Sequence, residues 1–300
     1  MSWRVVVISS IAKLDYKMDY LVVRNPEGTK RIHLSEISVL MIESTAVSLT
    51  AYLLCELVKR KIDVIFCDEK RLPMGNFLPI YGSHDTSLKF RRQIKWKNEI
   101  KDLVWEEIVR VKITGQAAIL KSFDKNGTEL LESYIRELQP GDDTNREGHA
   151  AKVYFNSLFG IDFSRGEECA VNAALNYGYS IILSAFAREI VANGFFTQIG
   201  IFHDNIFNEY NLACDLMEPF RPFVDYSVYK MQPKKLEHDE KMLLADILNR
   251  KVLIGGKIQY MTNAIKIYTK SVLDSLCEED MSFLKFPEYE LQIYEDNSFL

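Results

Sequence analysis

Three residues that are well separated in the chain could together hold a divalent metal ion: Glu147, His203 and Glu218. Two carboxylates and one imidazole leave coordination positions open, and such a donor set suits Mg²⁺ or Mn²⁺. Each residue lies in a segment that looks helical and largely apolar, where a charge without a partner is unfavourable. A shared ion would satisfy all three residues, and it points to phosphoryl chemistry on nucleic acid.

Each of these residues also has an explanation that needs no metal. Thr144 and Glu147 have the spacing of a capping box, in which the Glu side chain bonds the backbone at the helix start. A single histidine among apolar residues, such as His203, is often a hydrogen-bonded core residue. Asp215 and Glu218 lie one turn apart on a predicted helix face, so they would repel unless a cation lies between them, one is protonated, or both are solvated. The sequence leaves both sets of explanations open.

A basic stretch with aromatic and apolar residues between its charges contains Lys89, Arg91, Arg92, Lys95, Lys97 and Lys101. This pattern is typical of a surface that follows DNA phosphates, although a solvated helix face looks the same. We predict DNA binding by Lys89, Arg91, Arg92 and Lys95. We predict it also for Arg221, which could instead neutralise the nearby acids. Because the net charge of the chain is −5, a basic surface must be local or shared with a partner.

The elements that must position these residues indicate an α+β protein. Residues 1–75 read as a small β-rich domain with one helix from Ser48 to residue 60, because β-branched runs alternate there with turn signals. Residues 73–86 contain Pro73, Gly75, Pro79 and Gly82, a composition that suits a linker, and we place this linker at residues 76–86. Residues 87–300 read as a larger, all-helical catalytic domain. Its predicted segments are helices at 88–123, 129–138, 147–159, 168–192, 209–218, 239–250 and 263–276, and a small hairpin at 252–258.

No stretch of the sequence reaches the roughly 20 apolar residues that a membrane-spanning helix needs. The apolar run at the start is too short for the core of a signal peptide. We therefore expect a cytoplasmic protein with no membrane partner.

Four blocks of sequence, at residues 147–155, 172–179, 200–203 and 215–222, resemble in their order the motifs of the CRISPR spacer-acquisition integrase, the CRISPR-associated protein number one. The β-rich start and helical body extend this resemblance over nearly the whole chain, and the compact length is similar to the type II versions.

This resemblance implies a metal-dependent DNA nuclease and integrase. It implies that the metal-binding residues are Glu147, His203 and Glu218, with Asp215 as a supporting residue. The third ligand is Asp in some relatives and Glu here, so the metal position could differ. The resemblance further implies a homodimer formed through the N-terminal domain, and a heterohexamer in which two such dimers flank a dimer of the small second adaptation protein. Double-stranded DNA would be the substrate, and further type II adaptation proteins are possible partners.

We expect the reaction to be transesterification, in which the 3′-OH of a new spacer DNA attacks a phosphodiester at the repeat boundary of a CRISPR array. Because His203 must be neutral to bind a metal, activity should fall below about pH 6. Two alternatives stay open. One is a metal-dependent nuclease on branched DNA or RNA without integration, and the other is a non-catalytic subunit of a DNA-binding assembly.

Overall fold

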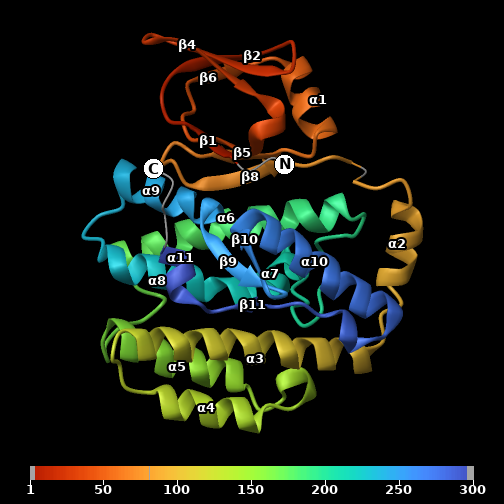
Figure 1. Ribbon diagram of the computed structural model, residues 1–300, viewed down its shortest axis with the longest axis vertical. Helices are drawn as coiled ribbons and strands as arrows, with labels where there is room; N and C mark the ends of the chain where they lie inside the picture. The colour runs from red at the N-terminus through yellow and green to blue at the C-terminus, as the bar shows by residue number, and fades with distance from the viewer. Residues whose placement is uncertain (1–3, 81, 296–300) are drawn as a thin grey trace.

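The computed structural model describes residues 4–80 and 82–295. Its β-rich N-terminal part lies above a larger helical body (Figure 1), which confirms the α+β class and the order of the two parts. The N-terminal elements are β1 (Arg4–Ile8), β2 (Ala12–Lys17), β3 (Tyr20–Asn25), β4 (Gly28–His33), β5 (Ile37–Ile42), β6 (Val47–Leu49), α1 (Ala51–Lys59), β7 (Asp63–Cys67) and β8 (Pro73–Phe77). The strands form two sheets, with orders β1-β5-β7-β8 and β4-β3-β2-β6. The predicted start of the helix at Ser48 is wrong, because Thr50 caps α1 by accepting a hydrogen bond from the backbone of Leu53.

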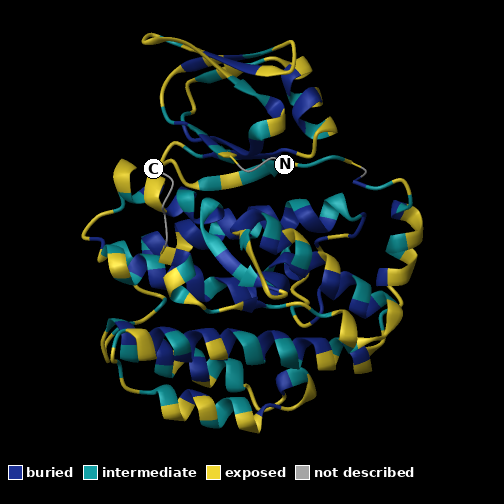
Figure 2. Cartoon of the chain, in the orientation of Figure 1, coloured by how far each residue is buried: buried dark blue, intermediate teal, exposed yellow. Residues whose placement is uncertain are grey.

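The central strand β5 joins the two parts of the molecule, because both of its faces are buried. Leu40 and Ile42 pack with α1 in the N-terminal core, whereas Val39 and Met41 pack in the core of the helical body. The dark blue band of buried residues at this level in Figure 2 marks that junction. Strands buried on both faces are typical of parallel pairing, and β5 pairs in parallel with both β1 and β7. The β-rich part is therefore packed firmly against the helices.

Part of the predicted linker is docked rather than extended. Strand β8 runs to Phe77 and so crosses the expected boundary at residue 75. The Asn76 side chain donates to Asp63 over 3.2 Å and accepts from the Ser184 hydroxyl over 3.0 Å. A Cβ on Gly82 would lie 1.6 Å from the backbone oxygen of Val191, so only glycine fits there. This segment holds the N-terminal sheet against the helical body.

The helical body contains the predicted helices, with changed limits. Its elements are α2 (Thr86–Gln93), α3 (Asn98–Ser122), α4 (Thr128–Glu137), α5 (Arg146–Phe159), α6 (Ala170–Ala192), α7 (Asn211–Met217), α8 (Arg221–Met231), α9 (His238–Ala245), β9 (Lys251–Ile254), β10 (Lys257–Tyr260), α10 (Met261–Glu278), β11 (Pro287–Glu288) and α11 (Leu291–Glu295). The predicted hairpin is confirmed as β9 and β10, and β11 completes a small three-stranded sheet within the helical body. None of the helices among residues 4–80 and 82–295 has the combination of length and low charge needed to cross a bilayer.

The single helix predicted over residues 88–123 is wrong, because the chain turns between α2 and α3. The buried side chain of Gln93 donates to the backbone oxygens of Phe196 and Ile199, each over 2.9 Å. Nearby, Trp96 stacks on Phe195 with ring centroids 5.8 Å apart. These contacts tie the end of α2 to the loop between α6 and α7. Tertiary contacts therefore override the local helical periodicity.

Candidate active site

Three segments of the helical body bring oppositely charged side chains together. The ammonium group of Lys112, on α3, forms ion pairs with Glu147 on α5 and with Glu218 at the end of α7, the latter over 2.5 Å. The Nε atom of Arg221 lies 2.9 Å from the other oxygen of Glu218. Two carboxylates that are 71 residues apart in the sequence thus share one cation.

The start of α5 presents Glu147 toward this cluster. Asn145, with a φ of 52°, caps the helix by accepting from the backbone of Gly148. The Asp142 carboxylate accepts from the backbone N–H groups of Arg146 and Glu147 over 2.8 and 2.9 Å. The backbone groups of the first turn are therefore satisfied by other residues, and the capping-box explanation of Glu147 is wrong. Its carboxylate pairs with Lys112 instead.

Glu218 is only 4% exposed, and the chain turns sharply at Pro219 immediately after it. Burial alone would raise the pKa of Glu218, but the charges of Arg221 and Lys112 outweigh burial and lower it. The carboxylate is therefore ionised at neutral pH. Its Oε2 atom is buried and has no partner with hydrogen-bonding geometry among the described residues, although it lies beside the Lys112 ammonium.

Lys112 is a site residue that sequence reasoning missed. It is 6% exposed and lies on the buried side of α3, between Ile108 and Gln116 at intervals of one turn. Burial favours the neutral form, but Glu218 and Glu147 raise the pKa of Lys112, which stays charged. A signal was present, since a lysine interrupts an apolar helical stripe at this position. Its partners could not be read from the stripe.

His203 lies in the loop between α6 and α7, not in a helix as expected. Its Nδ1 atom is 2.6 Å from Asp215 Oδ1. Asp215 is fully buried and also accepts from the backbone N–H groups of Ile201, Phe202 and His203 over 2.6, 3.2 and 3.1 Å. A side chain on Gly200 would collide with the His203 carbonyl and the Asp215 carboxylate. The loop is therefore built around one buried acid, and Asp215 lies directly behind His203.

Asp215 and Glu218 do not share a cation. Backbone N–H groups and His203 satisfy Asp215, whereas Lys112 and Arg221 neutralise Glu218. The hydrogen bond with Asp215 raises the pKa of His203, and the charge of Glu218 adds to this effect. The imidazole therefore lies within electrostatic reach of the carboxylate cluster.

Helix α3 also contacts residues 200–203, here called the histidine loop, through an aromatic residue. The ring of Trp105 stacks on Phe202 with centroids 4.5 Å apart and planes 2° apart. The same ring meets His203 edge-on at 5.9 Å. Because Trp105 and Lys112 both belong to α3, one helix sets the positions of the histidine loop and of the carboxylate cluster.

The sequence is similar to known proteins over most of its length. A family model described as CRISPR associated protein Cas1 matches residues 5–253. The CRISPR-associated endonuclease Cas1 of Neisseria meningitidis serogroup C (strain 8013) is 32% identical over 298 residues, which cover 96% of this chain and 97% of that protein. The chain belongs to the Cas1 family. The resemblance of the motif blocks is thus confirmed, and the type II-like expectation fits the Neisseria relative.

Two solved structures show that the fold of this Cas1 family member is shared. A casposase bound to its integration product has a TM-score of 0.76 at 17% identity, over 94% of this chain and 92% of that one. A Cas6-RT-Cas1–Cas2 complex contains a chain with a TM-score of 0.73 at 14% identity, over 96% of this chain and 36% of that one. At these identities the likeness concerns the fold alone.

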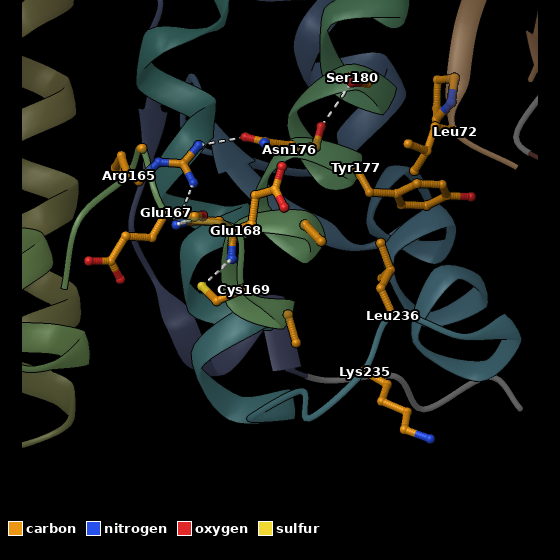
Figure 3. Close-up of a pocket in the computed structure, with 15 residues that line it drawn as sticks. Leu72, Arg165, Glu167, Glu168, Cys169, Asn176, Tyr177, Ser180, Lys235 and Leu236 are labelled. Carbon is orange, nitrogen blue, oxygen red and sulfur yellow. Dashed lines mark hydrogen bonds between the residues drawn. The ribbon is translucent and has the colours of Figure 1, made fainter. Parts of the chain in front are cut away.

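In this Cas1 family member, the carboxylate cluster opens into a cavity of about 210 Å³. Its lining includes Lys112, Glu147, Glu218, Arg221, Gln116, Asp225, Tyr179 and Arg165. Arg165 also lines a larger cavity of about 720 Å³, which contains none of the predicted site residues (Figure 3). There the Arg165 guanidinium donates to Asn176 over 2.7 Å, beside the start of α6. The smaller cavity is therefore the candidate active site, because it contains the predicted residues Glu147, Glu218 and Arg221; His203 and Asp215 are not among its lining residues.

The donor chemistry of the site fits a divalent cation. Among the described residues, no three His, Cys, Asp or Glu side chains are already grouped as metal ligands. Glu147 and Glu218 instead share the Lys112 ammonium. A position between two carboxylates attracts positive charge, and carboxylate oxygens are the preferred ligands of Mg²⁺ and Mn²⁺.

The predicted DNA-binding residues near α2 have different surroundings. Lys89 pairs with Asp85 over 3.2 Å, and Arg92 pairs with Glu278 of α10 over 3.3 Å. Arg91 and Lys95 are exposed, and neither has an ion-pair partner within the part of the chain that the structure describes. The acidic end of α10 therefore neutralises part of the basic stretch.

The fifth predicted DNA-binding residue, Arg221, lies in the site cavity. It neutralises Glu218, and its guanidinium also lies 4.7 Å from the centre of the Tyr179 ring.

Proposed function

We propose that this protein is a metal-dependent DNA integrase and endonuclease of CRISPR adaptation. It joins the 3′-OH ends of a new spacer DNA to the repeat of a CRISPR array by transesterification. The observation that carries this proposal is the meeting of Glu147 and the buried Glu218 at one cation position, beside His203. The family match and the relatives named as endonucleases support the enzyme class.

Glu147, Glu218 and His203 would hold Mg²⁺ or Mn²⁺, which when bound polarises the phosphate and favours the ionised form of the attacking hydroxyl. Asp215 would accept a hydrogen bond from the Nδ1–H group of His203. The Nε2 atom would then carry the lone pair that binds the metal. Arg221, already beside Glu218, is positioned to neutralise a phosphate that enters the cavity. The site needs only to position and neutralise the reacting groups.

The proposed reaction forms as many bonds as it breaks. One phosphorus–oxygen bond forms to the attacking 3′-oxygen, and one breaks to the leaving 3′-oxygen. The attacking hydroxyl loses a proton and the leaving oxygen gains one, so no oxidant, reductant or nucleotide is required. With water in place of the 3′-hydroxyl, the same site would hydrolyse DNA.

The proposal extends to the partners of the protein. We propose double-stranded DNA as substrate, a homodimer formed through the N-terminal domain, and a heterohexamer with a dimer of the small second adaptation protein. Support comes from the shared fold of a chain in a Cas6-RT-Cas1–Cas2 complex and of a casposase bound to its integration product. Further type II adaptation proteins are possible additional partners.

The decisive test is a strand-transfer assay with the purified protein, its small partner, a 3′-OH DNA fragment and a supercoiled plasmid that carries the repeat. Reactions contain Mn²⁺, Mg²⁺ or EDTA. We expect metal-dependent joined products. Metal-dependent nicking without joining would show a nuclease that does not integrate, and DNA binding without chemistry would show a non-catalytic subunit.

Activity should depend on pH through His203. The hydrogen bond to Asp215 raises the pKa of His203 above its ordinary value of 6.5, so a higher pH is needed to obtain the neutral imidazole. At subsaturating Mn²⁺ we expect the acid limb of the pH–rate profile to have its midpoint above 6.5, rather than near the pH 6 expected from the sequence. The same shift stabilises the fold below pH 6.5, a contribution that is lost as pH rises through the raised pKa. A midpoint at or below 6 would exclude control by this histidine.

DNA affinity should depend on the two exposed basic residues near α2. Replacing both Arg91 and Lys95 by alanine removes two phosphate contacts, so the slope of log affinity against log salt should fall by about two. Fluorescence anisotropy with a labelled duplex at several salt concentrations measures this slope. The control replaces two exposed basic residues of β4, Lys30 and Arg31, which lie far from α2 in the N-terminal part. An equal change in both variants would show only a general effect of net charge.

A further inference from the structure

One polar side chain in the active-site cavity lacks the partner that its burial requires. Gln116 lies on α3 one turn after Lys112, is 1% exposed and lines the cavity that holds the carboxylate cluster. Its Oε1 atom is buried and accepts no hydrogen bond from any residue that the structure describes. A buried amide oxygen without a donor destabilises a protein, so such a residue calls for an explanation.

A second buried glutamine shows what a purely structural role looks like. Gln93 is 2% exposed, and its amide makes three hydrogen bonds of 2.9 Å with the backbone of the loop between α6 and α7. Both ends of that amide are satisfied within the protein. The acceptor of Gln116 is not, and the residue lines the cavity that holds the carboxylate cluster.

The surroundings of Gln116 indicate which kind of group is missing. The carboxylates of Glu147 and Glu218 are occupied by Lys112 and Arg221, and the Asp225 carboxylate accepts from the Tyr179 hydroxyl. The Oε1 atom of Gln116 is therefore a hydrogen-bond acceptor that has no donor among the described residues. An acceptor is matched by a donor, and the donor that the proposed reaction brings to this place is the attacking hydroxyl.

We propose that Gln116 contacts the nucleophile: its Oε1 atom accepts a hydrogen bond from the attacking 3′-hydroxyl, or from water during hydrolysis. A neutral amide does not take up the proton, so Gln116 orients the oxygen toward phosphorus without acting as a base. This inference rests on the proposed function, because it needs a hydroxyl nucleophile in this cavity.

The test replaces Gln116 by methionine, which has a similar length and shape but no hydrogen-bonding amide. We expect the melting temperature of the DNA-free protein to rise, because an unsatisfied buried polar group is removed. We expect kcat for strand transfer to fall by about 100-fold, with little change in KM for DNA. The matched control, Gln93→Met, should lower the melting temperature, because satisfied hydrogen bonds are lost.

The outcomes separate this inference from the proposed function. A more stable Gln116→Met protein with a low kcat would support contact with the nucleophile. A variant that keeps its kcat, or that is destabilised like Gln93→Met or fails to fold, would overturn the inference and leave the integrase function standing. A wild-type protein without metal-dependent strand transfer or cleavage would overturn the proposed function and, with it, the role of Gln116.

Discussion

Replacing Glu218 by glutamine should lower strand transfer by a factor on the order of 10³, because it removes a buried carboxylate of the proposed metal-binding set. Glutamine keeps the shape but cannot supply the negative charge that attracts a divalent ion. Glu147 still pairs with Lys112 in the variant, so we expect a loss of stability of only about 1–3 kcal/mol. Single-turnover strand transfer with saturating Mn²⁺ measures the first effect, and denaturant unfolding measures the second.

The matched control for this change is Glu189→Gln. Glu189, on α6, has a side chain that is 7% exposed and pairs with Arg188 over 2.5 Å, so its burial and ion pairing resemble those of Glu218. It is not part of the site cavity. Glu189→Gln should therefore lose stability without losing strand transfer. If Glu218→Gln kept its activity within a few-fold of wild type, Glu218 would not be a metal ligand.

Replacing Lys112 by methionine should make the stability of the protein depend on a divalent ion. Without the ammonium group, Glu147 and the buried Glu218 lose their shared cation, which we expect to lower the free energy of unfolding by about 3–5 kcal/mol. Mn²⁺ should restore much of this loss, since a bound ion stabilises the folded state. Thermal melting with increasing Mn²⁺ concentration, with EDTA as reference, measures the recovery.

The control for Lys112→Met is a buried lysine that neutralises no comparable carboxylate pair. Lys241, on α9, is 6% exposed and donates to the backbone oxygens of Lys70 and Arg71 over 2.8 and 3.2 Å. The Lys241→Met protein should be less stable than the wild type, but Mn²⁺ should not restore its stability. Recovery of both variants would indicate general ion binding, and recovery of neither would contradict a cation position between Glu147 and Glu218.

The local elements of this fold follow from the sequence. The β-rich start, the helix that begins beside Glu147, and the hairpin of β9 and β10 are all confirmed. Periodicity, β-branched runs and turn residues act over a few neighbours, so a local pattern suffices to predict them. The ordered motif blocks also sufficed to indicate the family.

Errors arose where distant contacts decide the local structure. The break between α2 and α3 depends on hydrogen bonds from Gln93 to residues about 100 positions away. The histidine loop was expected to be helical because its residues are apolar, but Asp215 draws three successive backbone N–H groups toward itself. Neither contact leaves a periodic signal in its own segment.

What the sequence by itself determined is the order of the β-rich and helical parts and the family, and from these came the prediction that Glu147, His203 and Glu218 bind a metal with Asp215 in support. Only the tertiary structure showed that Lys112 lies between Glu147 and Glu218, that Arg221 neutralises Glu218, and that Gln116 lacks a partner. The physical reason is that the charge state and role of a buried polar group depend on what surrounds it in space. The position of Lys112 in an apolar helical stripe indicates burial, but its carboxylate partners lie on other elements and leave no signal in that stripe.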